Sequence, residues 1–167
     1  MTSSSWETHT IPKKIIPTNF DGEVKPGYWG RETNLTVVSK TIGVKLFKKM
    51  LSHISLDKTI MDSPEADDVI TSNLLTHYIE YNINDRYEIT RHHDNCTLTI
   101  IIYIYKDINV KDEFYINDER YNENRWNEND SYKVLAFNGY NEHWGKLTGK
   151  GIRKVLVFHY DKDDFIY

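Results

Sequence analysis

The strongest strand signal in the chain is the stretch Thr97-Leu98-Thr99-Ile100-Ile101-Ile102-Tyr103-Ile104-Tyr105. β-Branched and aromatic residues fill most of it, and such residues favour extended backbone in a sheet. The neighbouring segments also show a period of two, at which side chains share one face of a strand. We therefore expect further strands at residues 77–83, 87–93, 132–137 and 152–160, with turns at Asn84-Asp85 and Asn138-Gly139.

Two helices are expected before these strands. Residues 42–54 place apolar side chains at helical spacing, with lysines on the opposite face. Ser63-Pro64-Glu65 gives a capping residue, a proline at the first helical position and an early acid, and so predicts a second helix through about residues 70–75. Two helices followed by six or seven strands predict an α+β, mainly β fold, with the helices packed against a barrel or sandwich.

The length of 167 residues is that of a single domain with its own core. Proline and glycine in residues 1–34 favour an extended arm. Residues 42–75 would then be a helical support, and residues 77–160 the β-rich core. Within the core, residues 106–130 are rich in Asn, Asp, Glu and Lys, and there we expect a long, mobile, exposed loop that contains one weak strand around the apolar residues 114–116.

Composition restricts the class of protein. The net charge is −4, whereas a nucleic-acid-binding protein usually has an excess of basic residues. A local basic groove would not show in this total. The stretch Met1–Trp6 has no signal-peptide pattern and no later apolar run approaches a membrane span, so we expect a soluble, cytoplasmic protein. Cys96 is the only cysteine, which excludes an intrachain disulfide and a multi-thiolate zinc site.

Two separated stretches carry the residues of a candidate metal site. His92 and Asp94 lie two residues apart at the end of an expected strand, where they would point to the same face. His143 follows the second expected turn, and Arg153 comes at the tenth residue after it. Two imidazoles and one carboxylate leave half of the coordination sphere of iron(II) open, which indicates oxygen chemistry. Arg153 adds a planar guanidinium cation that can donate two parallel hydrogen bonds to a carboxylate.

This arrangement resembles the iron(II)/2-oxoglutarate-dependent dioxygenases over residues 81–160. The resemblance implies a double-stranded β-helix, or jelly roll, with N-terminal helices packed against it. It also implies that His92, Asp94 and His143 form the catalytic, metal-binding triad and that Arg153 binds the far carboxylate of 2-oxoglutarate. The run from Arg91 through Asn95, followed by the apolar strand, is most similar to the prolyl-hydroxylase-like branch.

The chain departs from that family pattern at two places. The branch usually has a Gly-Gly element after the apolar strand, where this chain has residues 110–114. Many members have a hydroxyl residue two positions after the arginine, where this chain has Val155. A hydroxyl from another strand would then share the carboxylate, and its mid-strand position favours Tyr103 as the second co-substrate-binding residue. The other candidates are Thr97, Thr99 and Tyr87.

The resemblance implies hydroxylation of a substrate C–H bond, with conversion of 2-oxoglutarate to succinate and carbon dioxide. The expected cofactors are Fe(II), 2-oxoglutarate as co-substrate and O2, with ascorbate as a further candidate. By branch resemblance the substrate is a peptidyl prolyl or other protein side chain, with a small molecule as the alternative. Nucleic acid is disfavoured because the demethylase branch carries a second arginine, whereas Arg153 is the last arginine here. The oligomeric state is left open.

Other residues near the site have simpler explanations. We expect His159 to be a hydrogen-bonded structural residue and His93 to lie on the surface or to contact a metal ligand. His77 has no partner pattern, Trp144 is expected to pack, and Cys96 to be buried as a small hydrophobe.

Two other functions remain open from the sequence. One is a non-catalytic jelly-roll binding or scaffold protein that keeps the barrel. The other is a metal-dependent hydrolase or nuclease that uses the same ligands, but this class would not explain an arginine in the last strand.

Overall fold

The computed structural model describes residues 5–121, 126 and 129–163, and most of that backbone is extended. The strands pair antiparallel throughout. They are β1 Trp6–Pro12, β2 Gly22–Pro26, β3 Thr33–Val38, β4 Leu74–His92, β5 Leu98–Lys106, β6 Val110–Ile116, β7 Glu119–Tyr121, β8 Ser131–Phe137 and β9 His143–Tyr160. Among the described residues the helices are α1, Lys40–Leu51, and the 3-10 turns η1 Lys13–Ile15, η2 Ala66–Asp68 and η3 Thr71–Asn73.

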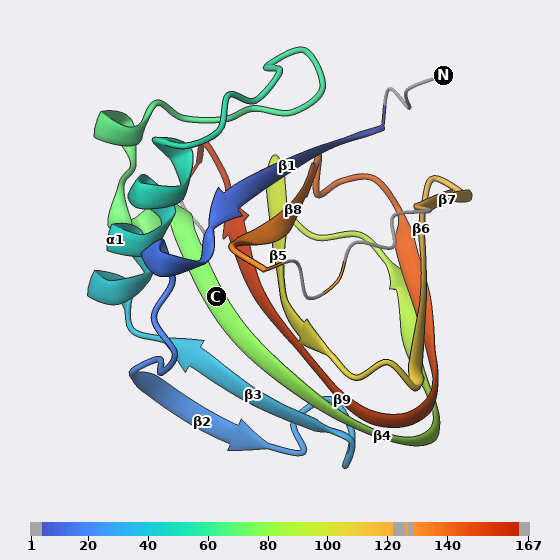
Figure 1. The fold of residues 1–167 in the computed structure, drawn as a ribbon. Coiled ribbons are helices and arrows are strands. Elements are labelled where there is room, and N and C mark those ends of the chain that lie inside the picture. Colours follow the sequence, from blue (N-terminus) through green and yellow to red (C-terminus); the bar gives the residue numbers. More distant parts are fainter. Residues whose placement is uncertain (1–4, 122–125, 127–128, 164–167) are drawn as a thin grey trace.

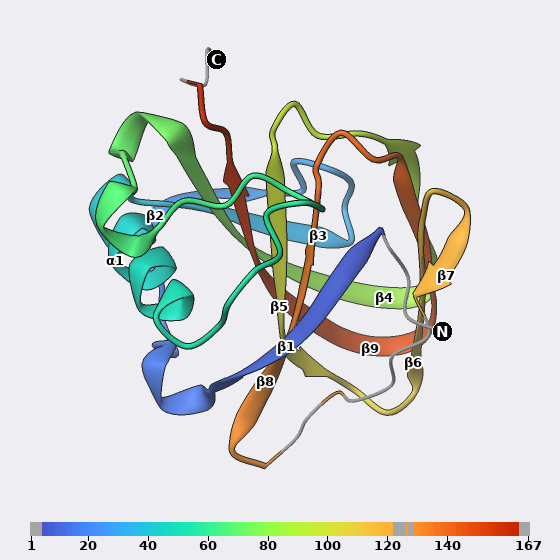
Figure 2. The ribbon, with the colours of Figure 1, turned by 90° about the horizontal axis from the view of Figure 1, so that it is seen from above.

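Two long strands, β4 and β9, pair along almost their whole length and connect two sheets. Their register runs from Leu74 opposite Tyr160 to His92 opposite His143. One half of this ladder belongs to a sheet of order β1-β8-β5-β9-β4-β3-β2. The other half of β9 pairs with β6, which in turn pairs with β7. Figures 1 and 2 show how β4 and β9 curve so that the second sheet lies opposite the first.

The pairing order identifies the architecture. The central strands of the first sheet are β8-β5-β9-β4, and those of the second are β4-β9-β6-β7. From β4 to β6 and from β8 to the end of β9 the consecutive strand segments alternate between these two facing sheets, and β6 and β7 form a hairpin within the second sheet. This is the topology of a jelly roll, or double-stranded β-helix. The prediction of a mainly β jelly roll is therefore confirmed.

The bend between the two halves of the ladder depends on left-handed backbone. Asp85 has φ 94°, and Gly149 opposite it has φ 100°, while Gly151 has φ 145°. A Cβ at Gly149 would lie 2.0 Å from the carbonyl oxygen of Asn109, so only glycine fits there. The predicted chain reversal at Asn84-Asp85 is wrong, because these residues bend one continuous strand instead of separating two.

The predicted helix over residues 42–54 corresponds to α1. Its buried side, which includes Leu46, Phe47 and Met50, packs on the outer face of the first sheet. The Phe47 ring lies 5.2 Å from the ring of Phe158 and 5.8 Å from that of Tyr160, measured between centroids. No helix in the described ranges is long and apolar enough to span a membrane.

The second predicted helix is wrong. Between Ser63 and Leu75 the chain forms only the two 3-10 turns η2 and η3. Val69 and Ile70 are adjacent instead of being spaced by three or four positions, so no apolar stripe is available for a helix. Thr71, Ser72 and Asn73 follow, and such side chains compete with helical backbone bonds.

The prediction of an extended arm over residues 1–34 is also wrong for residues 5–34, which the structure describes. β1 pairs with β8 from Trp6 opposite Phe137 to Pro12 opposite Ser131, and β2 pairs with β3. Pro12 and Pro26 stand at the ends of these edge strands, where a missing N–H is tolerated, and Pro17 lies in the connection between them. The first sheet therefore extends into the N-terminal part of the chain.

Residues 106–130 are more regular than predicted. They contain β6 and β7, joined by a tight turn at Asn117 and Asp118, whose φ values are 50° and 63°. The weak strand predicted at residues 114–116 is part of β6. The polar residue Asp112 stands among the inward-facing positions and hides the alternation that would reveal a longer strand. Residues 122–125 and 127–128 of this segment lie outside the described residues.

A core substitution tests the support that α1 gives to the first sheet. Phe47→Ala should lower the free energy of unfolding by about 3–5 kcal/mol, because it removes a fully buried aromatic ring and leaves a cavity. Lys45→Ala, on the exposed side of the same helix, should change it by less than about 0.5 kcal/mol. Urea denaturation followed by circular dichroism measures both, and equal effects would contradict this packing.

Candidate metal centre

The β4–β9 register brings two of the predicted ligands together. His92 is the last residue of β4 and His143 the first residue of β9, and they are opposite each other in the ladder. Their rings lie 4.3 Å apart between centroids. Asp94 lies just beyond the end of β4, so strand alternation alone does not position it. Its backbone N–H donates to the carbonyl oxygen of Gly139 at 2.7 Å, which holds the loop in place.

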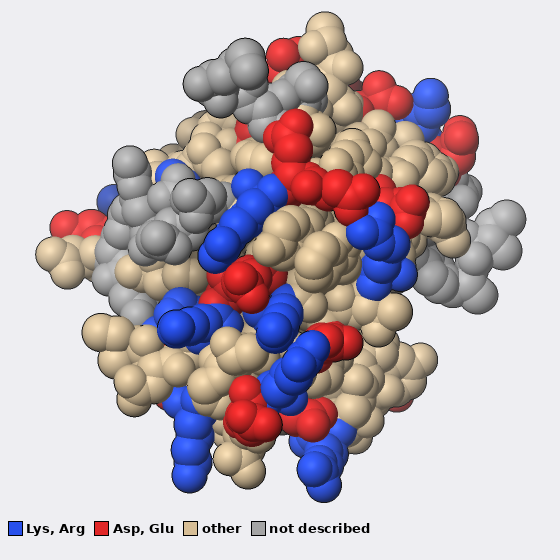
Figure 3. All heavy atoms as spheres, turned by 90° about the vertical axis from the view of Figure 1, so that its right-hand side faces the viewer, with Lys and Arg blue, Asp and Glu red and all other residues tan. Residues whose placement is uncertain are grey.

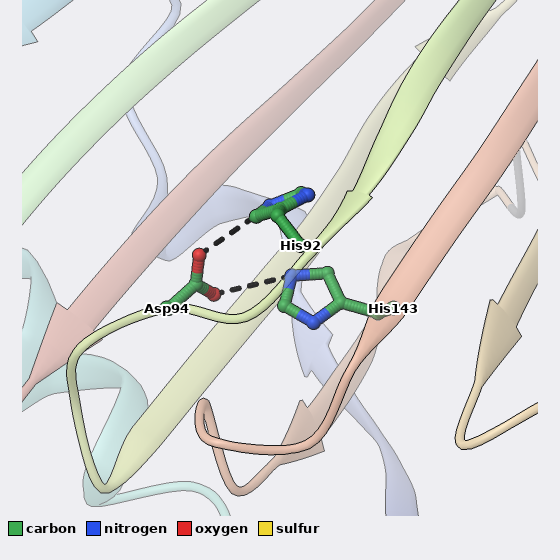
Figure 4. A group of neighbouring side chains, drawn as sticks. All are labelled: His92, Asp94 and His143. Atoms are coloured by element: carbon green, nitrogen blue, oxygen red, sulfur yellow. Dashed lines mark ion pairs between the residues drawn. The ribbon is translucent and has the colours of Figure 1, made fainter.

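The three side chains point toward a common centre, as Figure 4 shows. Nε2 of His92 lies 3.5 Å from Oδ1 of Asp94, and Nε2 of His143 lies 3.3 Å from Oδ2. One ligand atom from each residue lies within 4.8 Å of the others. The side chain of His92 is 45% exposed, whereas those of His143 and Asp94 are 5% and 15% exposed. The group therefore stands at the boundary between solvent and the barrel interior.

Backbone carbonyls set the orientation of both imidazoles. Nδ1 of His92 bonds the carbonyl oxygen of Thr90 at 2.5 Å, and Nδ1 of His143 bonds that of Asn141 at 2.8 Å. A carbonyl can only accept, so Nδ1 carries the proton in each ring and donates it. The lone pair of each Nε2 is then directed at the common centre, as a metal-ligating histidine requires.

Asp94 is held as a carboxylate. Burial favours its neutral form, but when His143 and His92 are protonated their Nε2–H groups donate to Asp94, which outweighs burial and holds the pKa of Asp94 far below its ordinary value. In return, the bond with Asp94 raises the pKa of His92. The hydroxyl of Thr99 donates to Oδ2 of Asp94 at 2.8 Å, and Nδ1 of His159 lies 3.6 Å from the same oxygen.

This donor set fits a divalent transition metal. Two neutral imidazoles and one ionised carboxylate on one side of an ion match the facial arrangement of non-haem iron sites and leave the other side open. A second group, Asp94, Cys96 and His159, has comparable spacing but shares its carboxylate with the first. Burial raises the pKa of Cys96 to about 12, so its thiol stays protonated and is a poor ligand. His92, Asp94 and His143 are the better metal site.

A cavity of about 510 Å³ extends from this group into the barrel. Arg153 also lines it, from an inward position on β9. Nε of Arg153 donates to Oδ2 of Asp112 at 2.8 Å. Burial disfavours the charge on Arg153, but Asp112 outweighs it and raises the pKa of Arg153 above its ordinary value. The structure thus brings all four residues predicted for the metal and co-substrate site to one cavity.

Tyr103, the second predicted co-substrate residue, is placed differently. It is buried near Arg153, with its ring centroid 6.0 Å from the guanidinium carbon, but it is not part of the cavity lining described above. Tyr81 does line the cavity, and its ring lies 4.8 Å from the same carbon. Since Tyr81 is opposite Arg153 in the β4–β9 register, it is the better candidate for a hydroxyl that assists the arginine.

Three other residues at the site were not predicted from the sequence to belong to it. His159 was expected to be structural, and it lies within contact distance of Asp94. His77 lines the cavity, its Nδ1 has no hydrogen-bond partner among the described residues, and burial lowers its pKa to about 4. Asp112, the partner of Arg153, was missed. Their inward positions follow from strand register, which the sequence alone does not fix.

Comparison with known proteins gives matches among solved structures alone. No family model matches the chain, and no curated protein matches it. Among solved structures, KdgF from Halomonas sp. aligns at 11% identity with a TM-score of 0.43, covering 84% of this chain and 86% of that one. A bsmA homolog from Methylobium petroleophilum PM1 aligns at 12% identity with a TM-score of 0.41, covering 56% of this chain and 42% of that one.

The Thr99 hydroxyl gives a test of the metal centre. Thr99→Val keeps the side-chain shape but removes the donor to Asp94, and should weaken binding of Fe(II) or Co(II) by about 10–100-fold. Thr97→Val is the matched control, because the Thr97 hydroxyl donates to the carbonyl oxygen of Tyr160 and not to Asp94. Anaerobic calorimetric titration measures both affinities. Equal affinities in the two variants would show that Thr99 does not support the ligand.

Proposed function

We propose that this protein is an iron(II)- and 2-oxoglutarate-dependent oxygenase that hydroxylates a substrate C–H bond and releases succinate and carbon dioxide. The observation that carries the proposal is the presence of His92, Asp94, His143 and Arg153 around one cavity. The metal-ligating group stands at the solvent end of that cavity. The arginine lies at the buried end, where a charge-assisted bond is strong.

Each group of the chain has a definite task in this proposal. His92, Asp94 and His143 hold the metal on one face, and Thr99 and His159 keep the carboxylate in position. Bound iron(II) would supply the activation of oxygen. Arg153 anchors the far end of the co-substrate, so that its 2-oxo acid end reaches the metal-binding group. Positioning of this kind is the main contribution of a protein to cofactor chemistry.

The cavity lining supports a co-substrate with polar ends and an apolar middle. Along the inward face of β9, Val155 and Val157 stand between Arg153 and His159. Ile79 and Ile101 line the same region from the neighbouring strands. The two methylene groups of 2-oxoglutarate would be buried against these side chains, which is favourable.

The proposed substrate is a protein or peptide side chain, with a peptidyl proline as the leading candidate, and a small molecule is the alternative. It would enter beside His92, the most exposed residue of the metal-binding group, and Trp29 and Tyr87 also line the cavity. Among the residues that the structure describes, the face shown in Figure 3 mixes basic and acidic side chains and so offers no continuous basic surface for a phosphate backbone. On the hairpin formed by β6 and β7, Arg120 pairs with Glu113 at 3.7 Å.

Loss of one ligand tests the metal's role. Anaerobic addition of iron(II) and 2-oxoglutarate to the wild type should give a visible absorption band that requires both components. His143→Ala should remove the band and succinate formation, because two remaining ligands rarely hold a labile metal. His93→Ala, which changes a neighbouring exposed histidine, should keep both. A wild type that binds iron(II) but gives no band with 2-oxoglutarate would instead support a binding protein or a hydrolase.

The arginine should act on the co-substrate and not on the metal. Arg153→Leu should weaken 2-oxoglutarate binding by at least about tenfold, since the cation is lost while the negative Asp112 remains. Iron(II) affinity should stay close to that of the wild type. Lys154→Leu, one position away on the opposite face of β9, is the control for a lost positive charge. An unchanged 2-oxoglutarate affinity in Arg153→Leu would show that this residue has another role.

A further inference from the structure

The cation proposed to bind the co-substrate already has a buried counter-ion. Side chains of Arg153 and Asp112 are only 3% and 6% exposed, and Nε lies 2.8 Å from Oδ2. Arg153 comes from the half of β9 in the first sheet, and Asp112 from β6 in the second sheet. The pair therefore crosses the interior of the barrel, where solvent does not screen it.

Aromatic rings keep the guanidinium in this position. Its carbon lies 4.8 Å from the ring centroid of Tyr81 and 5.5 Å from that of Trp126. Rings at these distances attract a cation and restrict its movement. Asp112 therefore remains next to Arg153 when a ligand reaches the guanidinium.

The charge balance of the loaded cavity follows from these contacts. Asp94 contributes one negative charge, and the Arg153–Asp112 pair contributes none in total. Glu88 also lines the cavity, but it is exposed to solvent and paired with Arg86, so it adds no net charge to this count. A divalent metal at His92, Asp94 and His143 would leave the cavity with one excess positive charge. A 2-oxo acid with a single carboxylate cancels that charge, whereas the two carboxylates of 2-oxoglutarate exceed it.

A second cation nearby does not reverse this balance. The ammonium group of Lys106 donates to the carbonyl oxygens of Asp107 and Val110, and it lines a separate hollow on the outer side of Asp112. Its side chain is only partly buried, so solvent screens its charge. Asp112 attracts Lys106 across this hollow but is hydrogen-bonded to Arg153, so Lys106 offsets only part of the Asp112 charge next to the guanidinium.

We propose that Asp112 removes most of the preference of Arg153 for a second carboxylate, so that the cavity accepts 2-oxo acids with an uncharged, hydrogen-bond-accepting far end. This specificity role rests on the proposed function, because it assumes that a 2-oxo acid binds between the metal group and Arg153. A neutral carbonyl at the far end can accept a hydrogen bond from the guanidinium. Because this carbonyl has no net charge, Asp112 repels it less than it repels a carboxylate. The far carboxylate of 2-oxoglutarate gains the same bond but is repelled by Asp112.

Two ligands of similar shape test this role. The dissociation constants of 2-oxoglutarate and its 5-methyl ester are measured anaerobically on the iron(II)-loaded protein by titration calorimetry and by the visible absorption band. The ester keeps a carbonyl acceptor at the far end and lacks the charge. For the wild type, the dissociation constants of the two ligands should differ by no more than about tenfold.

Asp112→Asn isolates the charge, because the amide oxygen of asparagine can still accept the bond from Nε of Arg153. In this variant the ratio of the affinity for 2-oxoglutarate to the affinity for the ester should be at least about tenfold higher than in the wild type. Glu113→Gln is the matched control: it removes a negative charge at the next position of β6, which faces away from the pair. The ratio of the two affinities should not change in Glu113→Gln.

Two results would overturn the specificity role. One is a wild type whose affinity for 2-oxoglutarate exceeds its affinity for the ester by about 100-fold or more. This measurement uses only the wild-type protein, so it does not depend on the folding of a variant. The other is an unchanged ratio in folded Asp112→Asn. If neither 2-oxo acid binds the iron(II)-loaded wild type, the proposed function itself fails, and the specificity role fails with it. Tight binding of 2-oxoglutarate alone overturns only the role of Asp112.

Discussion

The antiparallel ladder between β4 and β9 is the constraint on which the rest of the structure depends. It places His92 opposite His143 at one end and Tyr81 opposite Arg153 near its middle. The left-handed bend at Asp85 and Gly149 folds the same ladder across two sheets. One pairing register therefore builds the barrel, joins two ligands and sets the distance between the metal group and the arginine. A slip of one residue would turn every one of these side chains to the other face.

Much of this arrangement could be predicted from local patterns. The apolar run over residues 97–105 and the amphipathic run over residues 42–54 identify β5 and α1, because burial of one face leaves a periodic signal. Spacing around His92, Asp94 and His143 indicates the ligand set. Edge strands such as β1 leave a weaker signal. Prolines at their ends read as irregular backbone, and their pairing partners are distant in sequence.

What the sequence could not provide is the set of contacts made across the barrel. Asp112 reads as one acid among many in a polar segment, and only the β6–β9 register shows that it faces inward. Its partner Arg153 comes from a strand that is paired with different neighbours. The same holds for His77, whose neighbours Trp29 and His159 come from distant segments. Such contacts form only when the two sheets close into a barrel, and the periodicity of a single segment does not show how the sheets close.

The positions of the two imidazoles also bear on how the cavity is filled. His143 is buried and His92 is half exposed, so a metal bound between them and Asp94 would lie at the solvent end of the cavity. Arg153, at the other end, is almost fully buried. A ligand that enters beside the half-exposed His92 reaches the metal-binding group before it reaches the arginine. A larger substrate bound beside His92 would obstruct this route, so under the proposed function we expect the 2-oxo acid to bind before the substrate does.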